Sequence, residues 1–165
     1  MLSTEDRQLL ELISQDCRLS PEELSVQTGL SPEHITKRIK QWEDDKVIVQ
    51  YHPHINWEKT GEPQVAALIE VKVLPQRSFG FDKIAKRLIK YPQIKTVYLM
   101  SGGYDLALII EGKSMQEVAL FVAEKLATLE HIQSTATHFV LRRYKQDGVA
   151  LMGQEETPER LVVSP

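Results

Sequence analysis

The chain has 165 residues, of which 42% are hydrophobic and 26% charged, a composition typical of a soluble globular protein with room for two small domains. Its 20 basic and 23 acidic residues give a formal net charge of −3, which excludes a strongly basic nucleic-acid binder. No apolar run approaches the roughly 18 residues that span a membrane, and the N-terminus does not resemble a signal peptide. The single cysteine, Cys17, excludes an internal disulfide, so we expect a cytoplasmic protein.

Three short helices are predicted at the start of the chain. The first covers about Asp6 to Asp16 and carries leucine and isoleucine along one side. The second opens with the capping pattern Ser20-Pro21-Glu22-Glu23 and stops at Gly29, where the backbone must become left-handed. The same opening recurs at Ser31-Pro32-Glu33, and a third helix runs to about Asp44. Two helices joined by such a sharp turn form a helix-turn-helix.

The third helix has an apolar side and a polar side. Ile35, Ile39 and Trp42 recur at spacings of four and three residues, which places them against the other helices. The opposite side has the dimensions to enter the major groove of DNA. Its cations can meet phosphates or guanine edges, and its histidine and glutamine can read base edges. We therefore predict a surface that binds double-stranded DNA, made of Ser31, Glu33, His34, Lys37, Arg38, Lys40 and Gln41.

Two observations keep an alternative open. An ordinary solvated helix face also mixes charges in this way. Residues 1–60 hold 7 Lys and Arg against 11 Asp and Glu, a net charge of −4, so general attraction to phosphate is weak. The alternative is a small-molecule sensor with an N-terminal interaction module that does not bind DNA. If the domain does bind DNA, several copies should have to act together.

The second half of the chain predicts a different fold. A short strand at Val47–Tyr51 is expected to form a wing or a crossing arm, and prolines and Gly61 interrupt the segment that follows. Strands are then expected at 66–73, 94–100, 105–110 and 131–144, and helices at 81–89 and 115–126. Ser101-Gly102-Gly103-Tyr104 should form a tight hairpin. This order is that of the split βαβ, ferredoxin-like sandwich.

The predicted fold class is thus α+β, a winged helix-turn-helix domain followed by a ferredoxin-like βαββαβ sandwich. The domain boundaries are placed at residues 1–51, 52–63 for the linker, 64–145 for the sandwich and 146–165 for a tail. Both helices of such a sandwich cover one side of the sheet, and the other side is open. We expect that open side to be apolar, and therefore expect at least a dimer. Its predicted residues are Leu68, Val97, Leu99, Ala136 and Val140.

Enzyme chemistry is not indicated. His52 and His54 are the one close pair of histidines in the sequence, and no third ligand is near them, so no metal site is predicted. The sequence contains neither a glycine-rich phosphate loop nor a Ser or Cys nucleophile elbow. We therefore expect no catalysis and no cofactor. RNA binding by the sheet is also disfavoured, because Tyr98 is the one aromatic residue expected to be exposed on its central strands.

Both halves carry residues of a known family in the expected order. The helix-turn-helix region contains Leu9-Leu10, Gly29-Leu30-Ser31-Pro32, Arg38-Ile39 and Val47-Ile48. The second half contains Gly102-Gly103-Tyr104-Asp105 and, later, Thr135-x-Thr137 followed by Phe139-Val140-Leu141. With these motifs, residues 1 to about 145 resemble the Lrp/AsnC family of transcription regulators.

The resemblance implies dimers formed through the sandwich, which commonly assemble into larger rings, often octamers. It also implies an amino-acid effector bound between neighbouring sandwiches, near the hairpin between the second and third strands. Glycine N–H groups can take the carboxylate of such a ligand, and Asp105 can meet its ammonium. The alternative is that the glycines only form a turn and Asp105 caps it. The positions carried over are Ser101, Gly102, Gly103, Tyr104, Asp105, Thr135 and Thr137.

The sequence also departs from the family pattern. Lys46 stands after the third helix, where the family usually has glycine. Either that helix ends in another way, or Lys46 adopts left-handed backbone at some cost in stability. Residues 148–165 extend past the usual end of the family, and two roles stay open for them: docking on a neighbouring subunit or remaining mobile.

Overall fold

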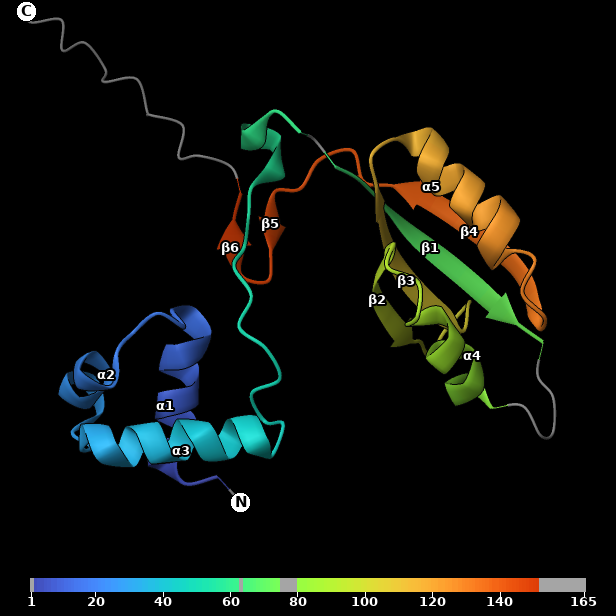
Figure 1. Ribbon diagram of the computed structural model, residues 1–165. Helices are drawn as coiled ribbons and strands as arrows, with labels where there is room; N and C mark the ends of the chain where they lie inside the picture. The colour runs from blue at the N-terminus through green and yellow to red at the C-terminus, as the bar shows by residue number, and fades with distance from the viewer. Residues whose placement is uncertain (1, 63, 75–79, 152–165) are drawn as a thin grey trace, which may run out of the picture. The chain divides into compact units, whose positions relative to one another are not determined.

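A computed structural model describes residues 2–62, 64–74 and 80–151 (Figure 1). The chain divides into two compact units, residues 1–54 and 55–165. Within the described ranges, none of the helices combines the length and the apolarity needed to cross a lipid bilayer.

The first unit is the expected helix-turn-helix domain. Its helices are α1 (Thr4–Gln15), α2 (Pro21–Thr28) and α3 (Pro32–Asp44). Ser20 and Glu23 form a capping box at the start of α2, and Gly29 ends that helix with a φ of 75°. A small core then holds α3 in place, with Ile35 and Trp42 almost completely buried. The other buried members of this core are Leu9, Ile13 and Leu24.

The segment that follows α3 differs in part from the prediction. Lys46 adopts left-handed backbone with a φ of 59°, which was one of the two expected alternatives. Over residues 47–51, all of which are described, the predicted strand is absent, since no second strand lies beside it to complete its hydrogen bonds. Tyr51 instead donates its hydroxyl to Glu43 Oε1 at 2.9 Å. Partial burial and the neighbouring carboxylate raise the pKa of Tyr51 to about 12.

The second unit contains the expected ferredoxin-like sandwich. Its four antiparallel strands lie in the order β2-β3-β1-β4. They are β1 (Val65–Val73), β2 (Ile94–Leu99), β3 (Leu106–Gly112) and β4 (Ile132–Phe139). The helix α4 (Phe81–Leu88) packs on the sheet beside α5 (Met115–Phe121), which continues as a π-helical turn, η2 (Val122–Leu126). Figure 1 shows the four strands next to one another in one sheet, together with α4 and α5.

The register of the strands corrects the predicted open face of the sheet. Val97 pairs with Leu108 and Leu99 pairs with Leu106, and both partners belong to the core beneath the helices. The prediction that Val97 and Leu99 lie on the open face is therefore wrong. The register shifts between Ile94 and Thr96, and such an irregularity reverses the phase of the residues that follow. The open face instead carries Thr96, Tyr98, Leu68, Ile109, Ala136 and Val140, together with Glu70 and His138, whose side chains lie 3.4 Å apart.

The chain after β4 also differs from the prediction. The last sheet strand ends at Phe139, whereas it was expected to run to Tyr144. A separate hairpin follows, made of β5 (Lys145–Gln146) and β6 (Val149–Ala150). Just beyond it, the Leu151 carbonyl accepts a hydrogen bond from Asn56 Nδ2 at 3.1 Å, beside the 3-10 helix η1 (Trp57–Thr60). The remainder of the predicted tail, from residue 152, lies outside the described residues.

Candidate nucleic-acid interface and effector site

The outer side of α3 gathers most of the residues predicted to bind DNA. Glu33, His34, Lys37, Lys40 and Gln41 are all exposed. Glu33, Lys37, Lys40 and Gln41 lie on the side of the helix opposite the buried Ile35 and Trp42, and His34 lies at its flank. The structure therefore presents two lysines, a histidine and a glutamine to solvent along α3, and a histidine or a glutamine has the hydrogen-bonding groups to meet a base edge.

Ser31 has a clear structural role at the start of this helix. Its Oγ accepts a hydrogen bond from the His34 backbone N–H at 3.3 Å, so Ser31 is the N-cap of α3. The hydroxyl hydrogen is not used in this bond and can still be donated to a phosphate oxygen. Ser31 thus orients the first turn of the helix, where recognition helices contact base edges.

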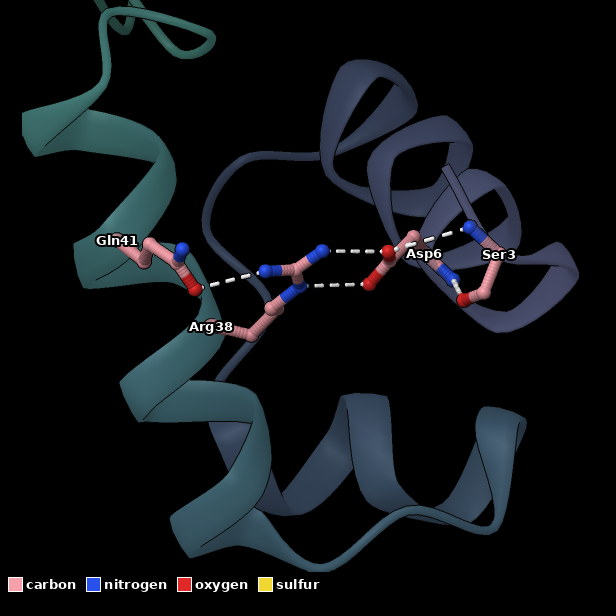
Figure 2. A network of polar contacts seen from close by, with 4 residues as sticks. All are labelled: Ser3, Asp6, Arg38 and Gln41. Atoms are coloured by element: carbon pink, nitrogen blue, oxygen red, sulfur yellow. Dashed lines mark hydrogen bonds and ion pairs between the residues drawn. The ribbon is translucent and has the colours of Figure 1, made fainter. Parts of the chain in front are cut away.

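Arg38 does not point outward as expected, because it bonds to α1 instead. Its Nε and Nη2 donate to the two carboxylate oxygens of Asp6 at 2.7 and 2.5 Å (Figure 2). Its Nη1 donates to Gln41 Oε1 at 2.7 Å, and its guanidinium carbon lies 5.1 Å from the centre of the Trp42 ring. All three guanidinium nitrogens are therefore engaged within the domain. Arg38 was expected to contact DNA, but in the structure its side chain connects α3 to α1 and so stabilises the domain.

Asp6 was not among the predicted site residues, although it holds α3 against α1. The hydrogen bonds from Arg38 lower the pKa of Asp6 from 3.8 to about 2, and those from Ser3 act in the same direction. At neutral pH the carboxylate is therefore fully charged and paired. Since the partners are 32 positions apart, helical periodicity gave no signal for this ion pair.

The loop between β2 and β3 is fastened to β1 by Asp105. The Asp105 Oδ2 atom accepts a hydrogen bond from the Val73 N–H at 2.8 Å. Its own N–H donates to the Val71 carbonyl at 3.0 Å, and its carbonyl accepts from Met100 N–H at 2.8 Å. These bonds are what the alternative capping role requires. The other carboxylate oxygen of Asp105, Oδ1, takes no part in the hydrogen bond with Val73.

The hairpin expected at Ser101-Gly102-Gly103-Tyr104 is present between β2 and β3. Neither Gly102 nor Gly103 has left-handed backbone, and a Cβ placed on either would meet no atom within 4 Å. The loop closes where the Met100 N–H donates to the Asp105 carbonyl at 2.8 Å, at the ends of the expected segment. Nothing within the described chain therefore requires glycine at these two positions.

The two parts of the predicted effector site lie at the same end of the sheet. Thr135 on β4 is paired with Val71 of β1, and Val71 also accepts the hydrogen bond from Asp105. The loop and the start of β4 thus flank the end of β1 from opposite sides. Thr137 lies two residues further along β4, paired with Ile69, and is exposed.

Two other features of the described residues lie apart from this loop. A groove of about 550 Å³ opens near the other end of β1, among Val65, Trp57, Met115 and Val140, and no predicted effector residue lines it. Among the side chains that the structure describes, no group of three or more His, Cys, Asp and Glu could hold a metal ion.

Comparison with known proteins identifies both units. The model of the AsnC-type helix-turn-helix domain matches residues 5–43, and that of the Lrp/AsnC ligand binding domain matches residues 66–150. The chain is 39% identical over 165 residues to the HTH-type transcriptional regulator YugG of Bacillus subtilis, with 99% of each chain covered. It is 25% identical to the proline dehydrogenase transcriptional activator of Rhizobium radiobacter, over 87% of this chain and 92% of that one.

Solved structures agree with these sequence matches. The complex of the transcriptional regulator NMB0573 from Neisseria meningitidis with L-Met has a TM-score of 0.74 at 25% identity, covering 92% of this chain and 97% of that one. AsnC of E. coli shares the fold, with a TM-score of 0.72 at 21% identity over 90% of this chain and 98% of that one. The chain therefore belongs to the Lrp/AsnC family, whose members are transcriptional regulators and not enzymes, and it is a DNA-binding regulator with a ligand-binding domain.

Proposed function

We propose that this regulator recognises specific DNA sequences through α3, acts as an oligomer, and changes its DNA binding when an amino acid occupies the loop between β2 and β3. The observation that carries the proposal is the exposed polar side of α3. Lys37 and Lys40 are exposed there, and in this proposal they contact phosphates, which position the protein on the duplex. His34 and Gln41 are also exposed, and in this proposal they read base edges, which give sequence preference.

The net charge of the first unit supports action by several copies. Residues 1–60 carry a charge of −4, so one domain gains little from general attraction to phosphate. Linking several such domains converts later binding steps into intramolecular ones and raises the total affinity. If each domain binds DNA weakly, an assembly that carries several of them fits a regulator that must contact two or more half-sites on the DNA at once.

Two apolar surfaces support self-association. On the open side of the sheet, Tyr98 is 59% exposed, and Leu68 and Ile109 are half-buried beside it. In the segment after α3, Val47, Val49 and Tyr51 are exposed at alternating positions. A second copy that covered these surfaces would remove apolar area from water and provide the partner strand that residues 47–51 lack.

The loop glycines support an effector at the predicted position. The turn does not require glycine at positions 102 and 103. Because neither glycine has a side chain, the space in front of the loop backbone is open. Backbone N–H groups that are accessible in this way suit a carboxylate. The Neisseria meningitidis relative, 25% identical to this chain, was solved with L-Met. We therefore favour an amino acid as the effector, with its ammonium near the second oxygen of Asp105.

Selection of bound fragments from genomic DNA tests this proposal. The full chain is compared with Lys37→Ala/Lys40→Ala and with Lys86→Ala, an exposed lysine of α4 that serves as the control. The wild type and the control should enrich the same fragments, and the double variant should lose them. Each selection is repeated with the twenty amino acids. Absence of enriched sequences would refute specific DNA binding, and enrichment that no amino acid alters would refute the effector.

A further inference from the structure

The side chain of Gln41 has a fixed orientation in the structure. Arg38 Nη1 lies 2.7 Å from Gln41 Oε1, while the other two guanidinium nitrogens bond to Asp6. A guanidinium can only donate hydrogen bonds, so the Gln41 atom that faces it must be the carbonyl oxygen. Figure 2 shows the amide nitrogen of Gln41 turned away from the guanidinium. The amide therefore presents its NH₂ group, and not its oxygen, away from Arg38.

This orientation limits what Gln41 can read. A free glutamine recognises adenine with two bonds, because its oxygen accepts from N6 and its nitrogen donates to N7. Here the oxygen is occupied by a charged donor. The N6 amino group of adenine would have to approach that oxygen beside the positive guanidinium, which repels the partly positive amino hydrogens. Guanine instead offers two neighbouring acceptors, O6 and N7, to the two N–H groups.

We propose that Gln41 is a specificity-determining residue that acts only as a hydrogen-bond donor and selects guanine on the major-groove edge. This inference rests on the proposed DNA binding through α3 and names the base chemistry of that site. Arg38 is the positioning residue, because it holds the oxygen of Gln41 without meeting DNA itself.

The surroundings of Arg38 make the arrangement rigid. Asp6 binds two of its nitrogens, and the Ser3 Oγ accepts from the Asp6 N–H at 3.0 Å while the Asp6 Oδ2 accepts from the Ser3 N–H at 3.3 Å. The guanidinium also lies over the Trp42 ring at 5.1 Å. These contacts fix the position of the Arg38 guanidinium, and its one hydrogen bond to Gln41 Oε1 sets which side of the amide faces away from it.

Selection from a randomised duplex library with the full chain tests the role of Gln41. The wild type should enrich a site with guanine at one position in each half-site. Gln41→Ala should lose roughly 5- to 150-fold of the preference at that position. Gln41→Glu keeps an oxygen for Arg38 but replaces the donor by an acceptor, so the preference should move to cytosine, whose N4 donates. Gln116→Ala, an exposed glutamine of α5, should leave the site unchanged.

Three results would overturn the role of Gln41: a wild-type preference for adenine at the affected position, an equal loss across all sequences in Gln41→Ala, or an unchanged site in Gln41→Glu. An equal loss would mean that Gln41 binds phosphate. A wild type that enriches no site at all would refute the proposed DNA binding instead.

Arg38→Lys tests the positioning role separately. A lysine can keep a charge near Asp6 but cannot donate to both Asp6 oxygens and to Gln41 in the same geometry. The amide of Gln41 would then be free to turn, and the variant should also bind sites with adenine at the position where the wild type requires guanine. A purely structural role would lower affinity for all sequences and keep the guanine preference, and that result would refute the orientation by Arg38.

Discussion

Asp6→Asn is expected to weaken the connection between α1 and α3 without removing any atom from the apolar core. The asparagine keeps the size of the side chain and one acceptor oxygen. It removes the negative charge that receives two hydrogen bonds from Arg38. The variant therefore isolates the ionic part of the contact.

The pKa of Asp6 sets the size of the effect. Lowering this pKa from 3.8 to about 2 corresponds to about 2.5 kcal/mol at 1.36 kcal/mol per unit. Water reaches the edge of the pair, since the Arg38 side chain is 28% exposed and that of Asp6 is 12% exposed. Screening by this water reduces the expected loss in the free energy of unfolding to about 1 kcal/mol at pH 7.

The pH dependence follows from the direction of the shift. A carboxylate with a lowered pKa in the folded state stabilises the fold above its ordinary pKa and loses this contribution as the pH falls through the folded pKa. The difference between wild type and Asp6→Asn should therefore be constant from pH 7 to about 5. It should shrink between about pH 4 and 2, where Asp6 becomes protonated.

Urea unfolding followed by tryptophan fluorescence measures this difference. The chain has two tryptophans, and Trp57→Phe leaves Trp42, in the core of the first unit, as the reporter. Glu11→Gln, an exposed acid on the same helix, is the matched control and should change little. Equal stability of wild type and Asp6→Asn at pH 7, or a difference that does not change with pH, would refute the reasoning.

Three further predictions concern the backbone, the effector loop and the assembly. Lys46→Gly should raise the free energy of unfolding by about 1 kcal/mol, because glycine adopts the φ of 59° without strain; an unchanged value in the same fluorescence assay would contradict this. Asp105→Ala removes the acceptor of the Val73 N–H and should destabilise the second unit by about 1.5 kcal/mol in thermal unfolding. Asp105→Asn keeps an acceptor for Val73, so it should lose only amino-acid binding, measured by calorimetry. Ile109→Glu, on the open side of the sheet, should reduce the mass seen by light scattering, and Leu120→Glu, on the exposed side of α5, should not; equal masses would exclude that side as the interface.

The features predictable from the sequence were those set by neighbouring residues. Ser20 and Gly29 define the ends of α2 through bonds and backbone angles within a few positions. The order of the sheet followed from alternation and from the connections between elements. The hairpin at Asp147 and Gly148 was overlooked, although this pair is a strong local turn signal and both residues have positive φ.

The features that escaped prediction depend on distant partners. A helical wheel gives the direction of the Cβ atom, but the long side chain of Arg38 reaches Asp6 on another helix. The phase of β2 depends on the shift of register after Ile94, which only the pairing with β3 defines. The strand expected at Val47–Tyr51 has the right composition, but none of the strands in the described residues pairs with it. For Arg38 and for β2, the deciding contact lies far away in the sequence.

Site-specific crosslinking to DNA tests the central claim, recognition by α3, most directly. The single cysteine permits it: in a Cys17→Ser background, Glu33→Cys carries a photoreactive label on the outer side of the first turn of α3. Lys86→Cys in the same background carries the label on α4. With a duplex from the selected fragments, the label at position 33 should crosslink to bases inside the enriched site, and the label at position 86 should not. Retained DNA binding with no crosslink from position 33, or with equal crosslinks from both positions, would contradict recognition by α3.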